Sequence, residues 1–152
     1  MKIAIGSDHG GFKLKEKLVQ FLRKAKFQVV DRGTYSQDSC DYPDFGYRVA
    51  MDVAKRKAQR GVLICKSGVG MSIAANKIPG IRAVLAYDKS QAIFSRLHND
   101  TNVITFGASF INSKKAKDIL RAWLSTDFEG GRHKRRLKKI KDIEMKFLRK
   151  IK

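Results

Sequence analysis

The chain has 152 residues, 43% of them hydrophobic, which is the size of one globular domain with one sizeable core. We therefore expect a single domain over residues 1–152. Its formal charge of +19, from 33 basic against 14 acidic residues, suits an anionic partner such as nucleic acid, an acidic membrane or a phosphorylated metabolite. Two cysteines without a CxxC pair or a Cys/His cluster argue against a disulfide framework and a structural metal site.

The expected location is the cytoplasm. The first apolar run turns polar after five residues, which is too short for a signal peptide. No apolar stretch approaches the roughly 18 residues of a membrane span. We therefore expect a soluble intracellular protein that does not associate with a membrane.

The first third of the chain alternates strands and helices. Residues 2–6 predict a strand, and apolar residues at helical spacing in a lysine-rich segment predict an amphipathic helix ending near Ala25. Residues 27–30 predict a second strand. Residues 31–44 carry Gly, Ser, Asp and Pro and predict a loop, and the apolar residues among residues 47–54 predict a second helix.

The most informative stretch is GVLICKSGVGMSIAAN, at residues 61–76. Its first five residues are apolar and predict a strand covered on both faces, so Cys65 should lie at the carboxyl end of that strand. A glycine-rich turn follows, and residues 73–76 lie on a third helix. A helix opening near Gly70 would direct unpaired N–H groups and a partial charge of about +0.5 at the cysteine, which favours a thiolate.

The alternation continues after this stretch. Residues 81–86 predict a fourth strand, residues 90–97 a fourth helix and residues 103–106 a fifth strand. Apolar residues between Ala116 and Leu124 predict a fifth helix. This order is typical of an α/β fold, and we expect a three-layer, Rossmann-like, doubly wound sheet of five mostly parallel strands with an additional C-terminal helix.

Residues 130–152 form a basic tail. They hold eleven basic and two acidic residues, which places +9 of the formal +19 in 23 residues. An apolar stripe at helical spacing predicts the C-terminal helix: Leu137, Ile140, Ile143, Phe147, Leu148 and Ile151. Two alternatives stay open for this stripe, packing on its own domain or docking on a second subunit.

Cys65 has two interpretations. A lone cysteine in an apolar strand is usually a small buried hydrophobe. Against this, titratable groups flank several of the other strands: Asp8, His9, Arg82, Asp88 and residues 98–100. Because loops from neighbouring parallel strands share one crevice, we expect these groups to gather near Cys65. The two histidines involved, His9 and His98, have helix capping as their alternative role.

Three known loop signatures are not fulfilled. The GVG at residues 68–70 begins a GxGxxG pattern, but the position of the third glycine is Ile73, so NAD binding is not expected. No Gly-Lys-Ser or Gly-Lys-Thr closes the loop as in a P-loop. A cysteine phosphatase would need an arginine six positions after its nucleophile, where this chain has Met71.

Six motifs, taken together and in order, resemble those of the RpiB/LacAB family of sugar-phosphate isomerases. They are SDHGG at residues 7–11, DYPD at 41–44, ICKSGVGMSIAANK at 64–77, GIRA at 80–83, HNDTNV at 98–103 and FEGGRH at 128–133. The resemblance covers nearly the whole chain. It implies an aldose-ketose isomerase of the pentose phosphate pathway, which interconverts ribose 5-phosphate and ribulose 5-phosphate through a cis-enediolate without a metal or cofactor.

The resemblance also implies roles for individual residues. Cys65 would be the general base that carries a proton between C2 and C1, a role that typically contributes roughly 10²- to 10⁴-fold. Backbone N–H groups of the following turn would stabilise the enediolate oxygen: Ser67, Gly68, Val69 and Gly70. His98 and Asp8 would open the furanose ring. Five residues would bind substrate, two at the sugar hydroxyls and three at the 5-phosphate: Tyr42 and Asn99, and His9, Arg132 and Arg136.

In this family, groups from both subunits complete each site. The resemblance therefore implies a homodimer or a dimer of dimers, with residues 130–152 at the interface and a sugar phosphate as small-molecule partner. Two positions depart from the family pattern. Lys66 stands where many members have glycine, and Ser109 stands where many carry an arginine that reaches the phosphate.

Two alternative functions remain. A six-carbon sugar phosphate, such as allose 6-phosphate or galactose 6-phosphate, would be accepted by the same chemistry. A nucleic-acid-binding protein would explain the positive charge, but the chain has no recognised binding module and few aromatic residues in its basic tail. Nucleic acid is therefore not the expected partner.

Overall fold

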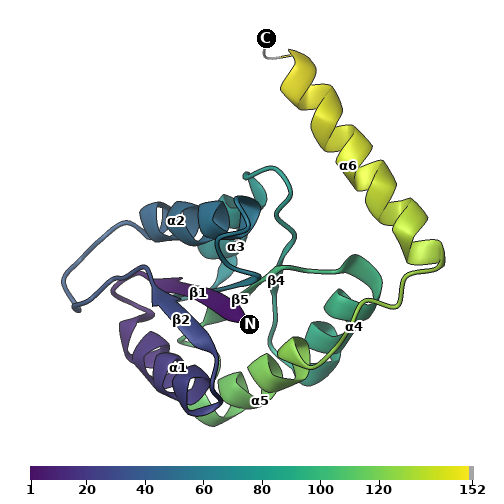
Figure 1. Ribbon diagram of the computed structural model, residues 1–152. Coiled ribbons are helices and arrows are strands. Elements are labelled where there is room, and N and C mark those ends of the chain that lie inside the picture. The colour runs from purple at the N-terminus through teal and green to yellow at the C-terminus, as the bar shows by residue number, and fades with distance from the viewer. Residues whose placement is uncertain (151–152) are drawn as a thin grey trace.

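A computed structural model describes residues 1–150, with side chains up to residue 148 (Figure 1). Within these residues, strands and helices alternate until the last two helices: β1 (Lys2–Ser7), α1 (Phe12–Lys24), β2 (Gln28–Asp31), α2 (Tyr42–Ala54), β3 (Arg60–Cys65), α3 (Val69–Asn76), β4 (Ala83–Leu85), α4 (Lys89–Asn99), β5 (Val103–Gly107), α5 (Ser113–Leu124) and α6 (Arg132–Lys150). No helix in this part of the chain combines the length and apolar character needed to cross a membrane.

The five strands form one sheet in the order β2-β1-β3-β5-β4, and every neighbouring pair is parallel. Helices α1, α4 and α5 contribute to the core on one face, and α2 and α3 to the core on the other (Figure 1). The expected three-layer, doubly wound α/β fold is confirmed, and the sheet is wholly rather than mostly parallel.

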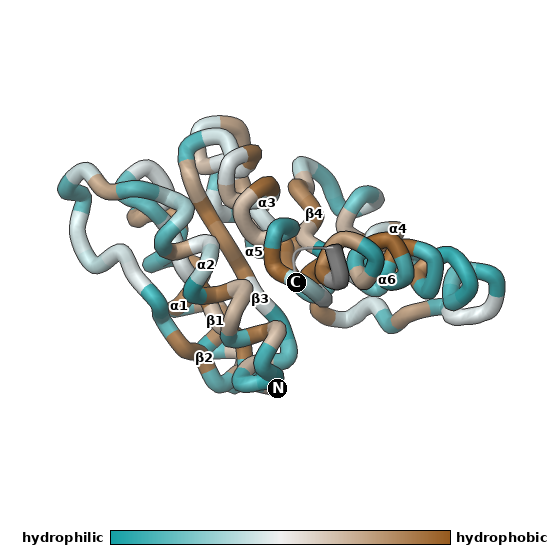
Figure 2. Tube along the Cα trace, turned by 90° about the horizontal axis from the view of Figure 1, so that it is seen from above, coloured by the Kyte–Doolittle hydropathy of each residue, from teal (hydrophilic) through white to brown (hydrophobic). Residues whose placement is uncertain are grey.

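The central strand β3 shows why the sheet is buried on both sides. Its side chains alternate, so that Val62 and Ile64 join the core beneath α1 and α5, while Leu63 and Cys65 join the core beneath α2 and α3. All four are almost fully buried. Figure 2 shows this strand as a continuous hydrophobic run through the middle of the molecule. An apolar run without polar alternation is therefore the signature of a doubly covered parallel strand.

Two elements differ from their predicted boundaries. Helix α2 begins at Tyr42, inside the predicted loop, because Asp41 has an extended backbone and Pro43 fits the first turn of a helix, where its missing N–H is not needed. Strand β4 is only three residues long. The chain enters β4 from outside the sheet, since the N–H groups of Arg82, just before the strand, and of Ala83, its first residue, donate to the side chains of Asn102 and Asn76.

Helix α6 confirms the predicted C-terminal helix, and it extends away from the α/β body (Figure 1). One anchor beyond its first turns is Glu144, whose side chain accepts a hydrogen bond from the N–H of Gly80 at 2.9 Å. The apolar stripe is largely uncovered within one chain: Ile143 is 57% exposed and Phe147 is 65% exposed. Ile151, the last residue of the predicted stripe, lies outside the described residues.

Candidate functional site

Cys65 is the last residue of β3, at the carboxyl edge of the sheet, as its position in the apolar run predicts. Only 4% of its surface is exposed. Its sulfur nevertheless accepts a hydrogen bond from the N–H of Gly68 at 3.1 Å. The cysteine is therefore a buried residue that lies in direct contact with a backbone donor.

The turn between β3 and α3 brings this donor to the sulfur. Gly68 has a φ of +78°, and a Cβ there would lie 2.5 Å from a Leu85 methyl group and 2.8 Å from the backbone of Phe106, so only glycine fits. Helix α3 begins one residue later, at Val69, whose N–H donates to the Ser67 hydroxyl at 3.3 Å. The other N–H groups of a first helical turn have no intrahelical partner and carry the positive end of the helix dipole. The turn can therefore stabilise a negative charge beside the sulfur.

The loop between β1 and α1 lies against the end of β3. A Cβ at Gly11 would lie 2.5 Å from the carbonyl oxygen of Ile64, so the two segments touch backbone to backbone. The Asp8 N–H donates to this carbonyl at 3.3 Å, and the buried Asp8 carboxylate accepts from the Gly11 N–H at 3.0 Å. This carboxylate is thereby held on the strand end that carries Cys65.

Two further predicted residues lie at this edge. The ring of Tyr42 packs on the backbone of Gly70, where an added Cβ would lie 2.6 Å from the ring. The Nδ1 atom of His9 lies 3.2 Å from both the backbone nitrogen and the carbonyl oxygen of Cys40, two residues before this tyrosine. We call the group of Asp8, His9, Tyr42, Cys65 and residues 67–70 the thiol site.

His98 does not belong to the thiol site of its own chain. It lies in the last turn of α4, which runs back from the carboxyl edge to the amino edge of the sheet. The segment after it pairs with the starts of other strands, since Asn102 accepts from the N–H of Gly61 at 2.9 Å and donates to Arg82 at 3.1 Å. The expectation that residues 98–100 and Arg82 gather around Cys65 is therefore wrong for one chain. A segment that precedes a parallel strand lies at that strand's amino end, opposite the loops that follow the strands.

The ring of His98 stacks on the ring of His133, with centroids 4.3 Å apart and planes 9° from parallel. Glu129 lies beside both rings: one carboxylate oxygen is 3.8 Å from Nε2 of His98 and the other is 3.9 Å from Nε2 of His133. We call these three residues the histidine cluster. Burial lowers the pKa of His133, which indicates that this ring is neutral at neutral pH.

Three more predicted residues surround the histidine cluster. Arg132 is the first residue of α6 and Arg136 lies one turn later; both guanidinium groups act to lower the pKa of His133 further. Asn99 ends α4. The predicted site residues therefore form two groups on one chain, and each group alone lacks part of the expected chemistry.

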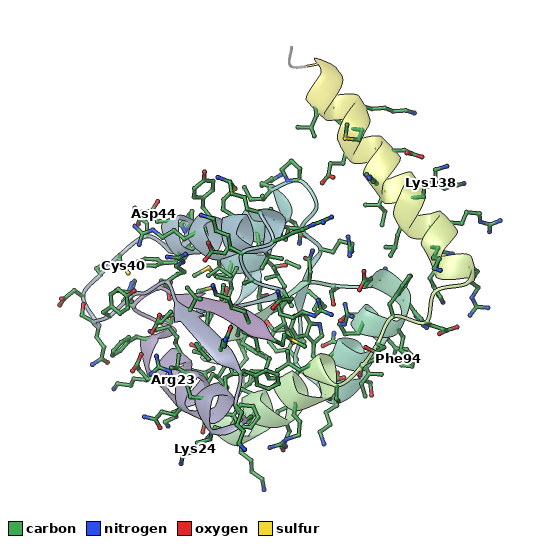
Figure 3. The ribbon with its side chains drawn as sticks, viewed as in Figure 1. Arg23, Lys24, Cys40, Asp44, Phe94 and Lys138 are labelled. Carbon is green, nitrogen blue, oxygen red and sulfur yellow. The ribbon has the colours of Figure 1, made fainter. Side chains whose placement is uncertain are left out.

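Figure 3 shows that residues close in sequence to the two groups lie on different sides of the molecule. Cys40 and Asp44, which flank Tyr42 in the sequence, lie on one side of the molecule. Phe94, one turn before His98, and Lys138 on α6 lie on the other side. No rearrangement of a single side chain could join the two groups.

The two positions that depart from the family pattern are neighbours. The Ser109 N–H donates to the carbonyl oxygen of Lys66 at 3.0 Å. The Cβ atom of Lys66 would lie 3.3 Å from a Cβ on Gly10, which places this exposed lysine against the loop of His9. The side chain of Lys66 therefore starts beside the loop that carries Asp8 and His9.

Sequence reasoning assigns no role to Glu129 or His133, although both lie in the FEGGRH segment. Their spacing of four residues, around Gly130 and Gly131, is the available signal. It could not identify the contact with His98, which comes from a different helix.

Comparisons with known proteins agree with this description. The family model described as Ribose/Galactose Isomerase matches residues 3–140. Ribose-5-phosphate isomerase B of Escherichia coli strain K12 is 47% identical over 145 residues, which cover 95% of this chain and 97% of that protein.

Solved structures are equally similar. Ribose-5-phosphate isomerase B of Clostridium thermocellum has a TM-score of 0.96 and 48% identity, covering 97% of this chain and 99% of that one. The enzyme of the same name from Mycoplasma genitalium, solved with bound ribulose 5-phosphate, has a TM-score of 0.91 and 39% identity, covering 95% and 96% of the two chains.

Proposed function

The chain belongs to the Ribose/Galactose Isomerase family and is an aldose-ketose isomerase, and we propose that its reaction is the interconversion of ribose 5-phosphate and ribulose 5-phosphate. The observation that carries this proposal is the Cys65 sulfur, held at 3.1 Å from the N–H of Gly68 at the start of α3. Ribulose 5-phosphate bound to the Mycoplasma genitalium relative supports the five-carbon substrate.

In the proposed reaction the Cys65 thiolate removes the proton from C2 of the open-chain aldose. The C2–H electron pair forms the C1–C2 double bond, and the carbonyl oxygen on C1 becomes the enediolate oxygen. The O2 hydroxyl then gives its proton to O1, the O2–H electron pair forms the C2 carbonyl, and the C1–C2 double-bond pair takes the proton from the sulfur at C1 to give the ketose. We assign backbone N–H groups of residues 67–70 to the developing charge, and one donor of this kind contributes about 3 kcal/mol.

The substrate enters mostly as a closed furanose, which must open first. Asp8 is fixed beside Cys65 by the Gly11 N–H, and we assign it one of the two proton transfers at the ring. We assign the other to His98. Since His98 lies at the opposite edge of the sheet in its own chain, it must come from a second copy of the chain.

The 5-phosphate, with nearly two negative charges, meets hydrogen-bond donors from both copies. His9 lies at the thiol site, and Arg132 and Arg136 lie on one face of α6, where planar guanidinium groups bind phosphate oxygens in pairs. Tyr42 and Asn99 are assigned to the sugar hydroxyls. The exposed Lys66 adds a cation beside His9, where Ser109 supplies none.

The exposed face of α6 supports the two-chain site. A groove of about 910 Å³ separates α6 from the body of the chain. It is lined by Ile140 and Phe147 on the helix side and by Leu85 and Asn99 on the other side. Apolar surface of this kind is covered in a homodimer, which a second copy provides with the thiol site of one chain facing the histidine cluster of the other.

A six-carbon sugar phosphate is the second candidate substrate, because the matching family model also names a galactose isomerase. Comparison of kcat/KM on ribose 5-phosphate, allose 6-phosphate and galactose 6-phosphate decides between them. If kcat/KM is higher on either six-carbon substrate than on ribose 5-phosphate, that substrate replaces ribose 5-phosphate in the proposed reaction.

The direct test measures conversion of ribose 5-phosphate by purified protein in EDTA. We expect turnover by the wild type and none by Cys65→Ala, with unchanged circular dichroism. Cys65→Ser is the matched control for size, and it should also be inactive because a serine hydroxyl is far less acidic than a thiol and supplies almost no anionic base at neutral pH. Full activity of either variant would remove Cys65 from the mechanism.

A further inference from the structure

The histidine cluster has the donor atoms of a metal site. One ligand atom each from His98, Glu129 and His133 lies within 4.8 Å of the other two. We propose that this cluster binds a divalent ion of the zinc class and that the bound ion inhibits the isomerase. The inhibition rests on the proposed function of His98, whereas the binding does not.

The buried nitrogen of His133 is the first argument. The His133 side chain is 3% exposed, and among the described side chains its Nε2 is one of three buried polar atoms without a hydrogen-bond partner. Glu129, the polar group beside it, is 3.9 Å away, which is too far for a hydrogen bond. Buried polar atoms rarely remain unpaired, and coordination of a cation would satisfy this one.

The kind of ion follows from the donor set. Two imidazole nitrogens and one carboxylate oxygen are typical of zinc, which takes a fourth ligand from water. Mg²⁺ and Ca²⁺ prefer oxygen ligands throughout, so they are not expected here.

The three side chains must move closer together to bind one ion. Zinc ligands lie about 2.0–2.2 Å from the ion and hence about 3.4 Å from one another, so the three ligand atoms, which now lie within 4.8 Å of one another, must approach by up to about 1.4 Å. The rings are nearly parallel, so one ring must tilt for both nitrogens to point at one ion. His98 is 36% exposed and Glu129 is 51% exposed, which leaves both free to move against the fixed His133.

The backbone holds the three residues together. The Glu129 N–H donates to the carbonyl oxygen of Leu97 at 3.1 Å, which ties the segment before α6 to the residue preceding His98. The His133 N–H donates to Gly130 at 3.0 Å in the turn that starts α6. The cluster is therefore preformed in one chain and does not depend on the second copy.

Two positively charged neighbours limit the affinity of the histidine cluster for a divalent ion. Arg132 and Arg136 lie close enough to lower the pKa of His133, and the same charges repel a cation. We therefore expect reversible, inhibitory binding, not a permanent structural ion. Bound zinc would occupy the lone pair of His98 and block its proton transfer to the sugar ring.

Binding is tested first, without any assay of activity. The full chain is freed of metal with EDTA, dialysed and titrated with Co²⁺, whose visible absorption reports coordination by protein ligands. We expect bands of a nitrogen- and oxygen-bound ion, with at least about tenfold weaker binding in Glu129→Gln and in His133→Asn. If His133→Asn does not fold, Glu129→Gln decides, because that side chain is half exposed.

Cys40→Ser is the control, because the Cys40 sulfur lies 3.9 Å from Nδ1 of His9 and forms a competing metal-binding pair. We expect this variant to bind Co²⁺ as the wild type does. A thiolate-to-cobalt charge-transfer band, or bands unchanged in Glu129→Gln, would place the ion elsewhere and overturn the proposal. So would the lack of any bands.

Inhibition is tested second, with Zn²⁺ added to the working enzyme and removed by EDTA. We expect Zn²⁺ to lower turnover reversibly in the wild type, and Glu129→Gln to need about tenfold more Zn²⁺ for the same fractional loss of its own rate. Equal sensitivity of the two proteins would overturn the inhibitory role. Absence of turnover in EDTA would instead refute the proposed function and leave the Co²⁺ result standing.

Discussion

The imidazole of His98 and the sulfur of Cys65 lie at opposite edges of the same parallel sheet. Cys65 ends β3 at the carboxyl edge, and His98 lies at the end of α4, where the chain returns to the amino edge. One reaction that uses both groups therefore needs two chains. In the proposed twofold dimer the thiol site of each copy would face the histidine cluster of the other, which would give two equivalent sites.

Mixing two inactive variants tests this arrangement. We expect Cys65→Ala and His98→Asn to be strongly impaired alone and to regain activity when coexpressed, because each mixed dimer has one site with both native groups. Random pairing makes half of the dimers mixed, and each has one intact site of two, so about a quarter of wild-type activity should return. Activity is measured on the whole mixture, and mixed dimers purified through two different affinity tags should reach about half of wild-type activity. No recovery would mean that both groups act within one chain.

Arg136→Ala should mainly raise KM for ribose 5-phosphate. Loss of a charge-assisted hydrogen bond to phosphate costs about 1.5–3 kcal/mol, which corresponds to at least about tenfold in KM. Lys138→Ala is the matched control, because it removes an exposed charge from the same helix two residues away. Steady-state kinetics of both variants give the answer. A KM unchanged in Arg136→Ala would remove this residue from the phosphate site.

Lys66→Ala should have a smaller effect in the same direction. An exposed ion pair contributes about 0.2–1 kcal/mol, so we expect KM to rise about two- to fivefold with little change in kcat. The increase should shrink at high salt, since an exposed pair is screened. Lys24→Ala serves as the control for net charge, because Lys24 is the last residue of α1, at the end of the helix away from the loop of His9 (Figure 3). A salt-independent KM in the wild type would contradict this role.

The order of strands and helices could be predicted from the sequence because buried strands are apolar runs and helices carry apolar residues at helical spacing. The apolar run at residues 61–65 and the glycine at position 68 identify the thiol site for the same local reason. The position of His98 could not be found in this way. It depends on which edge of the sheet α4 returns to, which is a property of the parallel topology and not of the residues near position 98.

The helix start at Tyr42 and the contact of His133 with His98 were missed for two different reasons. Asp41 and Pro43 fit both a turn and the start of a helix, and only the packing of Tyr42 on Gly70 decides between them. Contacts between side chains of two separate helices leave no periodic signal in either one.

His133 makes stability depend on pH. Burial lowers its pKa in the folded chain below the usual 6.5, so the unfolded chain binds the proton more readily. The free energy of unfolding should therefore fall as pH falls below about 6.5, until both states are protonated. Urea unfolding in EDTA between pH 5 and pH 7.5 measures this slope. His133→Asn should flatten it, and an equally steep slope in that variant would assign the dependence to other groups.

The uncovered stripe on α6 has a consequence for how much of this protein a cell needs. If Phe147 and Ile143 are buried only against another copy, a separated chain holds a thiol site and a histidine cluster that are each incomplete. Such a chain is inactive. Specific activity must then collapse on dilution, falling in proportion to chain concentration once most pairs have come apart. The abundance of the protein thereby becomes a control on sugar-phosphate flux, independent of any effector.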